Sequence, residues 1–335
     1  MSIYRLHTVA AALGAATLLA NVALAGSANA ETPDSDRDDQ YSQMFKFEQA
    51  VYSLNGISDV RFTQLLGVNN KGTIAGYHGD ENTENTPNKG FTLKLSGKVP
   101  SADLNFTDEN FPGSDQTQVI AINNDGDTVG FYVTAGVTHG FMKAEGKDPI
   151  TVDLPGTTFN QLLGLNNKGQ AAGYFQDNAP TPLQHAYVRG KNGDFRVLNL
   201  PTPSSQATGI NDKGVVVGFL QQSTADTRSS GFILKNGKDT QLNYPGSTFT
   251  QALGINNSDD VVGTFTDPNG MPHGFVYEGG RYRTVDFAGG NLNVSGTLVN
   301  GINDHNEIVG FFQTANNDGQ TDTRGFIGVP AAPSR

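Results

Sequence analysis

The sequence contains no cysteine and no tryptophan among its 335 residues. The absence of cysteine excludes a disulfide framework, cysteine-ligated zinc and a thiol nucleophile. Basic residues are scarce as well: 22 Lys and Arg stand against 33 Asp and Glu, a formal net charge of -11 at pH 7. Binding to nucleic acid needs clustered cations that neutralise phosphates, so we expect no nucleic-acid partner. Only 16% of the residues are charged, which argues against a disordered acidic chain.

Residues 1–30 have the organisation of a secretory signal peptide. Arg5 lies in a short polar start, and an apolar stretch rich in Ala and Leu runs from Val9 to Ala25. Ala28-Asn29-Ala30 then has the small-x-small form that signal peptidase cleaves. A transmembrane anchor is the alternative, but it needs about 20 apolar residues and the clean apolar run is shorter. We expect cleavage near Ala30, a periplasmic or extracellular product, and no membrane span.

A short segment in which an aliphatic residue precedes Asn-Asn or Asn-Asp recurs six times, with its first Asn at 69, 123, 166, 211, 256 and 303. Seven residues after this Asn every copy has a glycine, and a small residue followed by an aromatic one comes later. These small–aromatic steps are Gly90-Phe91, Gly140-Phe141, Ala186-Tyr187, Gly231-Phe232, Gly274-Phe275 and Gly325-Phe326. Six copies in one register establish an internal repeat with a period near 45 residues.

Each repeat is predicted to form four short antiparallel strands. The Asn-Asn-x-Gly positions favour hairpin turns, because Asn and Gly tolerate positive φ. The flanking apolar stretches are short and alternate with a period of two. The recurrent strand glycine lets neighbouring backbones approach closely, and the following aromatic ring fills the space. A period near 45 with four strands is typical of a β-propeller blade, whereas solenoid coils use shorter repeats.

The two ends of the repeat array favour a closed ring. The last copy stops after its third strand, at 326–329, and an extra strand at 45–54 precedes the first copy. Pairing of these two strands would leave no free sheet edge. The predicted fold is therefore all-β: a β-propeller of six four-stranded blades closed by pairing of the N- and C-terminal segments. It forms a single repeat domain at 45–330 after a flexible acidic leader at 31–44, and we expect a monomer.

The pattern G-I-N-[ND]-x-G-x-x-V-G followed by H-[GA]-F resembles the bacterial extracellular repeat family named HAF, after its His-Ala-Phe step. The resemblance covers about 45–329, with His185-Ala186-Tyr187 closest to the name and His139 and His273 at the same position of two other copies. Copies one, four and six depart from it, with Lys89, Ser230 and Arg324 in place of His. The resemblance implies export from bacteria and a repeat fold, and it implies no particular activity.

Amide side chains recur at one position of the repeat. Five of the six copies have a glutamine three residues before the Gly or Ala of the first strand, and the sixth has Leu298. A ring of amides at one end of a central channel, with Tyr77 nearby, would offer donors and acceptors to sugar hydroxyls or peptide groups. The alternative is that each amide hydrogen-bonds a neighbouring blade. The five residues are Gln64, Gln118, Gln161, Gln206 and Gln251.

Copy one departs most from the repeat. His78 stands where the other copies have Tyr, Phe or Leu, and Asp80 and Glu81 follow it. A carboxylate that orients this histidine would make a general base, with Arg324 or Lys89 pairing a substrate anion. The alternative is a structural histidine beside a polar loop. Copies one and six also carry extra residues, around 103–110, 288–295 and 314–323, which could form one rim of a cleft.

Motifs for metals and cofactors are weak. Residues 123–127 and 316–319 resemble fragments of calcium loops but have no closing Glu, so we expect no metal and no cofactor. Two functions remain open. The chain is either a binding or scaffolding module for an envelope or extracellular glycan or protein, or a secreted carbohydrate-active lyase or hydrolase with a site on the rim of the first and last repeats. A purely structural surface component is a third, weaker alternative.

Overall fold

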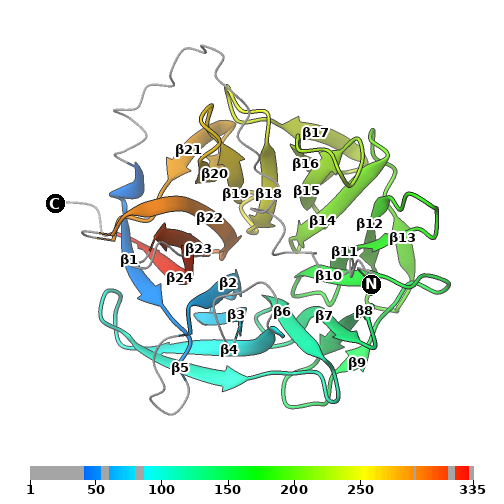
Figure 1. Cartoon of the computed structure of the whole chain (residues 1–335), viewed down its shortest axis with the longest axis horizontal. Helices are drawn as coiled ribbons and strands as arrows, with labels where there is room; N and C mark the ends of the chain where they lie inside the picture. Colours follow the sequence, from blue (N-terminus) through cyan, green and yellow to red (C-terminus); the bar gives the residue numbers. More distant parts are fainter. Residues whose placement is uncertain (1–40, 54–59, 80–86, 290–291, 316–320, 332–335) are drawn as a thin grey trace, which may run out of the picture.

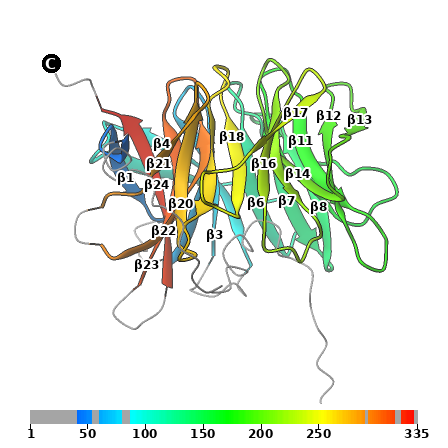
Figure 2. The same ribbon diagram turned by 90° about the horizontal axis from the view of Figure 1, so that it is seen from above.

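A computed structural model describes residues 41–53, 60–79, 87–289, 292–315 and 321–331 of the chain. Twenty-four β-strands run through these residues, so the expectation of an all-β chain is confirmed. Figure 1 shows the sheets arranged as a ring around a central axis. Figure 2 shows the strands running along the direction of that axis.

Four sheets contain four strands each, in sequential antiparallel order. Their bounds are β6 (Gln116–Ile122), β7 (Thr128–Thr134), β8 (Val137–Lys143), β9 (Ile150–Thr151); β10 (Asn160–Leu165), β11 (Ala171–Gln176), β12 (Gln184–Arg189), β13 (Phe195–Val197); β14 (Ser204–Ile210), β15 (Val216–Gln221), β16 (Ser230–Lys235), β17 (Lys238–Leu242); and β18 (Thr250–Ile255), β19 (Val261–Thr266), β20 (Pro272–Glu278), β21 (Arg281–Val285). Each sheet corresponds to one sequence repeat.

An eight-stranded sheet brings the two ends of the chain together. One part is β2 (Phe62–Val68), β3 (Thr73–Gly79), β4 (Lys89–Ser96) and β5 (Asp103–Asp108). The other part is β22 (Val294–Ile302), β23 (Ile308–Ala315) and β24 (Thr321–Pro330), with β1 (Phe45–Ala50) antiparallel to β24. A single parallel pair, Phe62 with Thr323, joins the two parts. Isolated bridges of the same kind link other neighbouring sheets, at Thr138–Phe159 and Ser229–Phe249.

The side chain of the first Asn of a turn, illustrated by Asn69, makes hydrogen bonds that hold the turn together. Asn69 Oδ1 accepts hydrogen bonds from the backbone of Lys71 and Thr73, which closes its own turn. Asn69 Nδ2 donates to the backbone carbonyl of Asn123 in the neighbouring sheet, at 2.9 Å. The sequence argument from positive φ was incomplete here, because positive φ belongs to the fourth turn residue, such as Gly72. The asparagine side chain instead connects two sheets by the hydrogen bond from its Nδ2 to a backbone carbonyl of the neighbouring turn.

The second residue of each turn forms a ring around the axis. Its backbone N–H donates to the side-chain oxygen of the same residue in the next sheet, at 2.8–2.9 Å, and the series returns from Asp304 to Asn70. Burial alone would raise the pKa of Asp304, but hydrogen bonds from Asn70 and Asn257 outweigh it and lower that pKa. We call this set the axial turn ring: Asn70, Asn124, Asn167, Asp212, Asn257 and Asp304.

The recurrent strand glycine allows the first two strands of each sheet to pair. A Cβ atom at this position would lie 1.9–2.3 Å from a carbonyl oxygen of the first strand, that of the residue before the one opposite the glycine, and beside the aromatic ring of the third strand in most sheets. The aromatic residue of the small–aromatic step is 0–1% exposed in every copy. The sequence interpretation of a close approach filled by a ring therefore agrees with the geometry. The glycines are Gly76, Gly130, Gly173, Gly218, Gly263 and Gly310.

A pair of glycine substitutions in one sheet tests this packing. Gly218→Ala would place its Cβ 1.9 Å from the Gln206 carbonyl oxygen and 2.8 Å from the Phe232 ring. We expect it to lower the free energy of unfolding by at least about 3 kcal/mol through overpacking. Gly237→Ala is the control, because its Cβ meets nothing within 4 Å and only the positive φ of 76° is strained. Chemical denaturation should show a loss of about 1–2 kcal/mol for the control; equal losses would contradict the packing argument.

Candidate ligand-binding site on the axis

The first strand of each of the six repeats lines the axis (β2, β6, β10, β14, β18 and β22), and two cavities lie along this axis. The larger, of about 110 Å³, is lined by residues of all six first strands, including the axial turn ring. The smaller, of about 70 Å³, lies nearer the starts of the strands. A middle layer lines both cavities and separates the two ends of the axis. It consists of Leu66, Ile120, Leu163, Thr208, Leu253 and Asn300.

The recurrent glutamines lie at the strand-start end, two residues before the middle layer. All five are buried, at 1–7% exposure, and Gln64 and Gln206 line the smaller cavity. Gln118, Gln161 and Gln251 occupy equivalent strand positions, each two residues before a bulge, and they are not among the residues that line the cavity. The sequence pattern therefore locates a real layer of amides, which we call the glutamine layer.

The members of the glutamine layer differ in their hydrogen bonds. Gln64 Oε1 accepts from the Tyr77 hydroxyl of its own sheet at 2.6 Å, and Gln206 Nε2 donates to Gln184 Oε1 of the preceding sheet at 2.7 Å. The Oε1 atoms of Gln118, Gln161 and Gln251 are buried without a hydrogen-bond partner. Bonding between neighbouring blades, the alternative drawn from sequence, thus accounts for Gln206, whereas Gln64 bonds within its own sheet.

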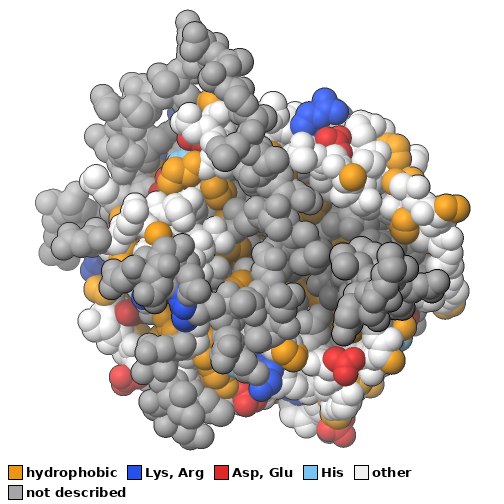
Figure 3. Space-filling view, in the orientation of Figure 1, with side chains coloured by type: hydrophobic (Ala, Val, Ile, Leu, Met, Phe, Trp, Pro, Cys, Tyr) orange, Lys and Arg blue, Asp and Glu red, His pale blue; other side chains and the backbone are white. Residues whose placement is uncertain are grey.

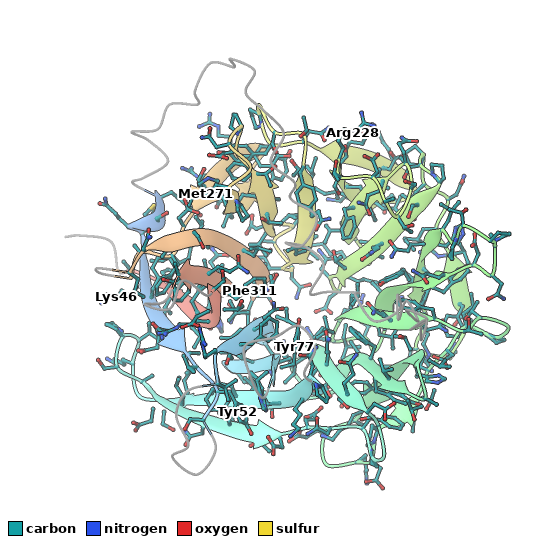
Figure 4. The ribbon with its side chains drawn as sticks, viewed as in Figure 1. Lys46, Tyr52, Tyr77, Arg228, Met271 and Phe311 are labelled. Atoms are coloured by element: carbon teal, nitrogen blue, oxygen red, sulfur yellow. The ribbon has the colours of Figure 1, made fainter. Side chains whose placement is uncertain are left out.

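Apolar side chains form the walls of the smaller cavity. Phe219 and Phe311 line it with Leu298 and the aliphatic members of the middle layer, and none of its lining residues is charged. Figure 4 shows Tyr77 and Phe311 close to the centre of the ring and Tyr52 farther out. On the described part of the face in Figure 3, basic and acidic side chains lie scattered without a broad basic patch. The axis therefore offers an uncharged, mostly apolar pocket with buried amide acceptors.

Three histidines pair with carboxylates in separate sheets. His139 Nδ1 lies 2.7 Å from Asp153, His185 Nε2 lies 2.9 Å from Asp177, and His273 Nδ1 lies 2.9 Å from Asp286. Burial lowers the pKa of His273, but Asp286 and Asp267 outweigh it and raise that pKa above its usual value. No group of three His, Asp or Glu side chains suited to a metal ion occurs in the described part of the chain.

His78 lies in the packing of its sheet. It belongs to β3, is 4% exposed, and stacks on the Tyr52 ring at 3.6 Å between centroids. Phe265 stacks on Tyr244 and Phe312 on Phe287 in the same way, at 3.5 and 3.9 Å. His78 therefore occupies an aromatic position of the fold. Asp80 and Glu81, its candidate carboxylate partners, lie outside the described residues.

Arg324 and Lys89, the residues expected to pair a substrate anion, contact other residues of the protein. Arg324 donates to Asp322 Oδ2 at 3.1 Å, and Arg61 donates to the other oxygen of the same carboxylate at 2.7 Å. Asp322 is 4% exposed, so this cluster ties β24 to the residue that precedes β2. Lys89 lies opposite His78 in the pairing of β3 and β4. Neither His78 nor Arg324 is among the residues that line the two axial cavities.

The extra residues of copies one and six are largely strand rather than loop. Residues 103–108 form β5, the fourth strand of its sheet, paired along its length with β4. The described residues of 314–323 extend β23 and β24, where Ala315 lies opposite Thr321. The described parts of these extra residues are therefore ordered by strand pairing, because added residues that continue a hairpin satisfy their backbone groups by pairing, and their role as one rim of a cleft stays a prediction.

Comparisons with known proteins identify no family. No family model matches the chain, and no curated protein matches it, so the resemblance to the HAF repeats stays a prediction. Among solved structures, the beta-propeller domain of the Trilobed protease from Pyrococcus furiosus is 10% identical, with a TM-score of 0.45 over 83% of this chain and 86% of that one.

Two further solved structures are similar to a comparable degree. An Aleuria aurantia lectin mutant in complex with Fucalpha1-6GlcNAc is 12% identical, with a TM-score of 0.45 over 88% of this chain and 98% of that one. Polysaccharide lyase Uly1 is 11% identical, with a TM-score of 0.42 over 83% and 80%. These likenesses assign no function to this chain. Among the described residues, no helix is long and apolar enough to cross a membrane.

The packing of His78 gives a testable consequence. His78→Ala removes the stack on Tyr52, and we expect a loss of about 2–3 kcal/mol in the free energy of unfolding. His305→Ala is the matched control, since His305 is exposed in a turn, and it should change stability by no more than about 0.5 kcal/mol. Thermal and urea unfolding measure both. A His78 variant as stable as the control would place this histidine outside the packed interior.

Proposed function

We propose that this chain is an exported β-propeller that binds an extracellular or cell-envelope glycan at the strand-start end of its axis. The observation that carries the proposal is the glutamine layer. Gln64 and Gln206 line an uncharged cavity, and three further amide oxygens of the layer, which lie outside its lining, are buried without a partner among the described residues. An amide supplies both donors and acceptors, so amides in the lining of an uncharged, mostly apolar cavity suit the hydroxyl groups of a sugar.

The proposal includes a ring of six four-stranded blades closed by the two ends of the chain. It is supported by the pairing of β1 with β24 and by the axial turn ring, which runs from Asp304 back to Asn70. The approach of Gly301 to Leu66 and Gly67 of the first sheet supports it too. A closed ring holds the glutamine layer in fixed positions, and a site fixed before binding loses less entropy when it takes a ligand.

Catalysis by the first and last repeats is the alternative. A secreted carbohydrate-active lyase or hydrolase would use His78 with Asp80 or Glu81 as acid and base, and Arg324 to pair an anion. A general base must come within hydrogen-bond reach of its substrate. The stacking of His78 on Tyr52 and the engagement of Arg324 by Asp322 favour structural roles for both. We therefore propose binding rather than turnover, by a monomer without metal or cofactor.

Export is part of the same proposal, because an extracellular glycan is reached only from outside the cytoplasm. Residues 1–30 would be removed after Ala30, so the mature chain would begin at Glu31. Expression in a bacterial host followed by intact-mass measurement of the exported protein tests this expectation. A secreted or periplasmic product that retains residues 1–30 would contradict it.

A carbohydrate screen tests the binding function. The purified protein is heated with soluble cell-wall and extracellular glycans, and hits are titrated by calorimetry. We expect at least one neutral glycan to raise the melting temperature, since a ligand that binds only the folded chain stabilises it. Binding should survive in His78→Phe, which restores the aromatic residue of other copies. If His78→Phe loses binding and the wild type converts the glycan to product, the catalytic alternative is favoured instead.

A further inference from the structure

We infer that the smaller axial cavity receives a methyl group carried by a neutral sugar, either the methyl of a 6-deoxy sugar or that of an acetyl group. This inference rests on the proposed glycan-binding function and deepens it, because it names the substituent by which the site selects its ligand. Three properties of the cavity carry it: the side chains that line it, the hydrogen bonds these side chains already make, and the space they leave.

Most of the lining of the smaller cavity is apolar. Seven of its eleven lining residues are aliphatic or aromatic, and none is charged. A hydrocarbon group gains by leaving water for such a surface, whereas a charged group would lose its hydration uncompensated. The seven residues are Leu66, Ile120, Leu163, Phe219, Leu253, Leu298 and Phe311.

The two polar residues of the middle layer are already bonded within the protein. Thr208 Oγ1 donates to the Ala252 carbonyl at 2.8 Å, and Asn300 Nδ2 donates to the Leu65 carbonyl at 3.0 Å. A sugar hydroxyl that reached this layer would find these donors engaged, and a buried hydroxyl that lacks a partner is costly. A methyl group carries no such cost, so this end of the cavity selects for it.

The two glutamines of the lining lie one layer nearer the strand starts. Gln64 Oε1 accepts from Tyr77, and Gln206 Nε2 donates to Gln184 Oε1, so one end of each amide is used within the protein. The opposite ends, a donor on Gln64 and an acceptor on Gln206, can serve the hydroxyls of a ligand. A sugar bonded at this level would direct a substituent toward the apolar middle layer.

The volume of the cavity suits a substituent and not a whole sugar. An apolar cavity of about 150 Å³ holds one benzene ring, whereas this cavity has a volume of about 70 Å³. A pyranose ring is larger than benzene and does not fit in that space, but a methyl or acetyl group does. The ring of the sugar therefore lies at the level of the glutamines, with only its apolar substituent in the cavity.

The sixth repeat supplies an apolar pair of the lining and a way to alter it. Leu298 and Phe311 lie opposite one another, at the positions that Gln64 and Tyr77 occupy in the first repeat. The double substitution Leu298→Gln and Phe311→Tyr copies the polar pair into the sixth repeat. Because the two introduced groups can bond one another, as Tyr77 and Gln64 do at 2.6 Å, we expect the variant to fold.

Leu292→Gln is the matched control. It makes the same change of residue in the same repeat, but Leu292 is 39% exposed and lies outside the lining of the cavity. Thermal unfolding in the absence of ligand checks that both variants are folded. The control should keep the affinity and the selectivity of the wild type, whereas the double variant should lose the preference for methyl.

Calorimetric titration with pairs of sugars that differ at one substituent tests the inference. L-fucose against L-galactose and L-rhamnose against L-mannose compare a methyl with a hydroxymethyl group, and N-acetylglucosamine against N-formylglucosamine compares an acetyl with a formyl group. We expect the wild type to prefer the methyl-bearing member of at least one pair by about tenfold or more. In the double variant this preference should fall at least about fivefold, because the hydroxymethyl or formyl group then meets polar side chains. The pair that shows the preference identifies whether the methyl belongs to a deoxy sugar or to an acetyl group.

Xenon provides a second measurement that needs no sugar. Apolar cavities take up xenon, so a crystal of the wild type under xenon pressure should hold a xenon atom beside Leu298 and Phe311. The double variant should hold less xenon at this position, and Leu292→Gln should hold as much as the wild type.

Two outcomes would overturn the inference while the proposed function stands. One is carbohydrate binding by the wild type with no preference inside any of the pairs, and the other is carbohydrate binding by a protein whose cavity does not admit xenon. If no carbohydrate binds the wild type, the proposed function is wrong, and a methyl-bearing sugar is excluded with it even where xenon enters the cavity.

Discussion

The hydrogen bonds between neighbouring turns are the constraint on which the rest of this molecule depends. In five of the six turns the first asparagine accepts hydrogen bonds from its own turn through Oδ1 and donates to the neighbouring turn through Nδ2, whereas Asn123 Nδ2 donates to Asp127 of its own turn. The axial turn ring adds a second set of bonds one residue farther along. Together they fix how far apart the first strands lie. Glycines such as Gly164 and Gly209, whose backbones meet closely, fit only at that spacing.

The two ends of the axis differ in how their polar groups are satisfied. At the turn end, each backbone N–H of the axial turn ring donates to the side-chain oxygen of the next member, so these donors and acceptors are paired within the protein. At the strand-start end, three amide oxygens and the Tyr174 hydroxyl are buried without partners. The structure thus concentrates its internal bonding at one end and leaves hydrogen-bonding capacity at the other.

Much of this arrangement could be predicted from the sequence, because it follows from local pattern. The repeat period, the alternation of apolar residues and the strand glycine each reflect one sheet, and they predicted four strands and a buried ring. The glutamine layer was visible as well. Features that depend on contacts between two sheets could not be predicted from the sequence. Which glutamine lacks a partner depends on neighbours such as Gln184, and the stacking of His78 depends on Tyr52, which belongs to the segment after β1. Residues 103–108 were recognised only as extra residues and not as the strand β5, because the pairing of β5 with β4 has little sequence signature of its own.

The pairing of β1 with β24 has a consequence for the order of events in the cell. Phe47 is synthesised long before Gly328, its partner in the register. Until β24 has been made, β1 has an unpaired edge that other chains could join. Long-range pairing of this kind is also slow, since most of the polypeptide must be confined before the contact forms. Chains cut short before β24 would therefore be released with that edge exposed, and the pairing of β24 with β1 removes an edge that promotes aggregation.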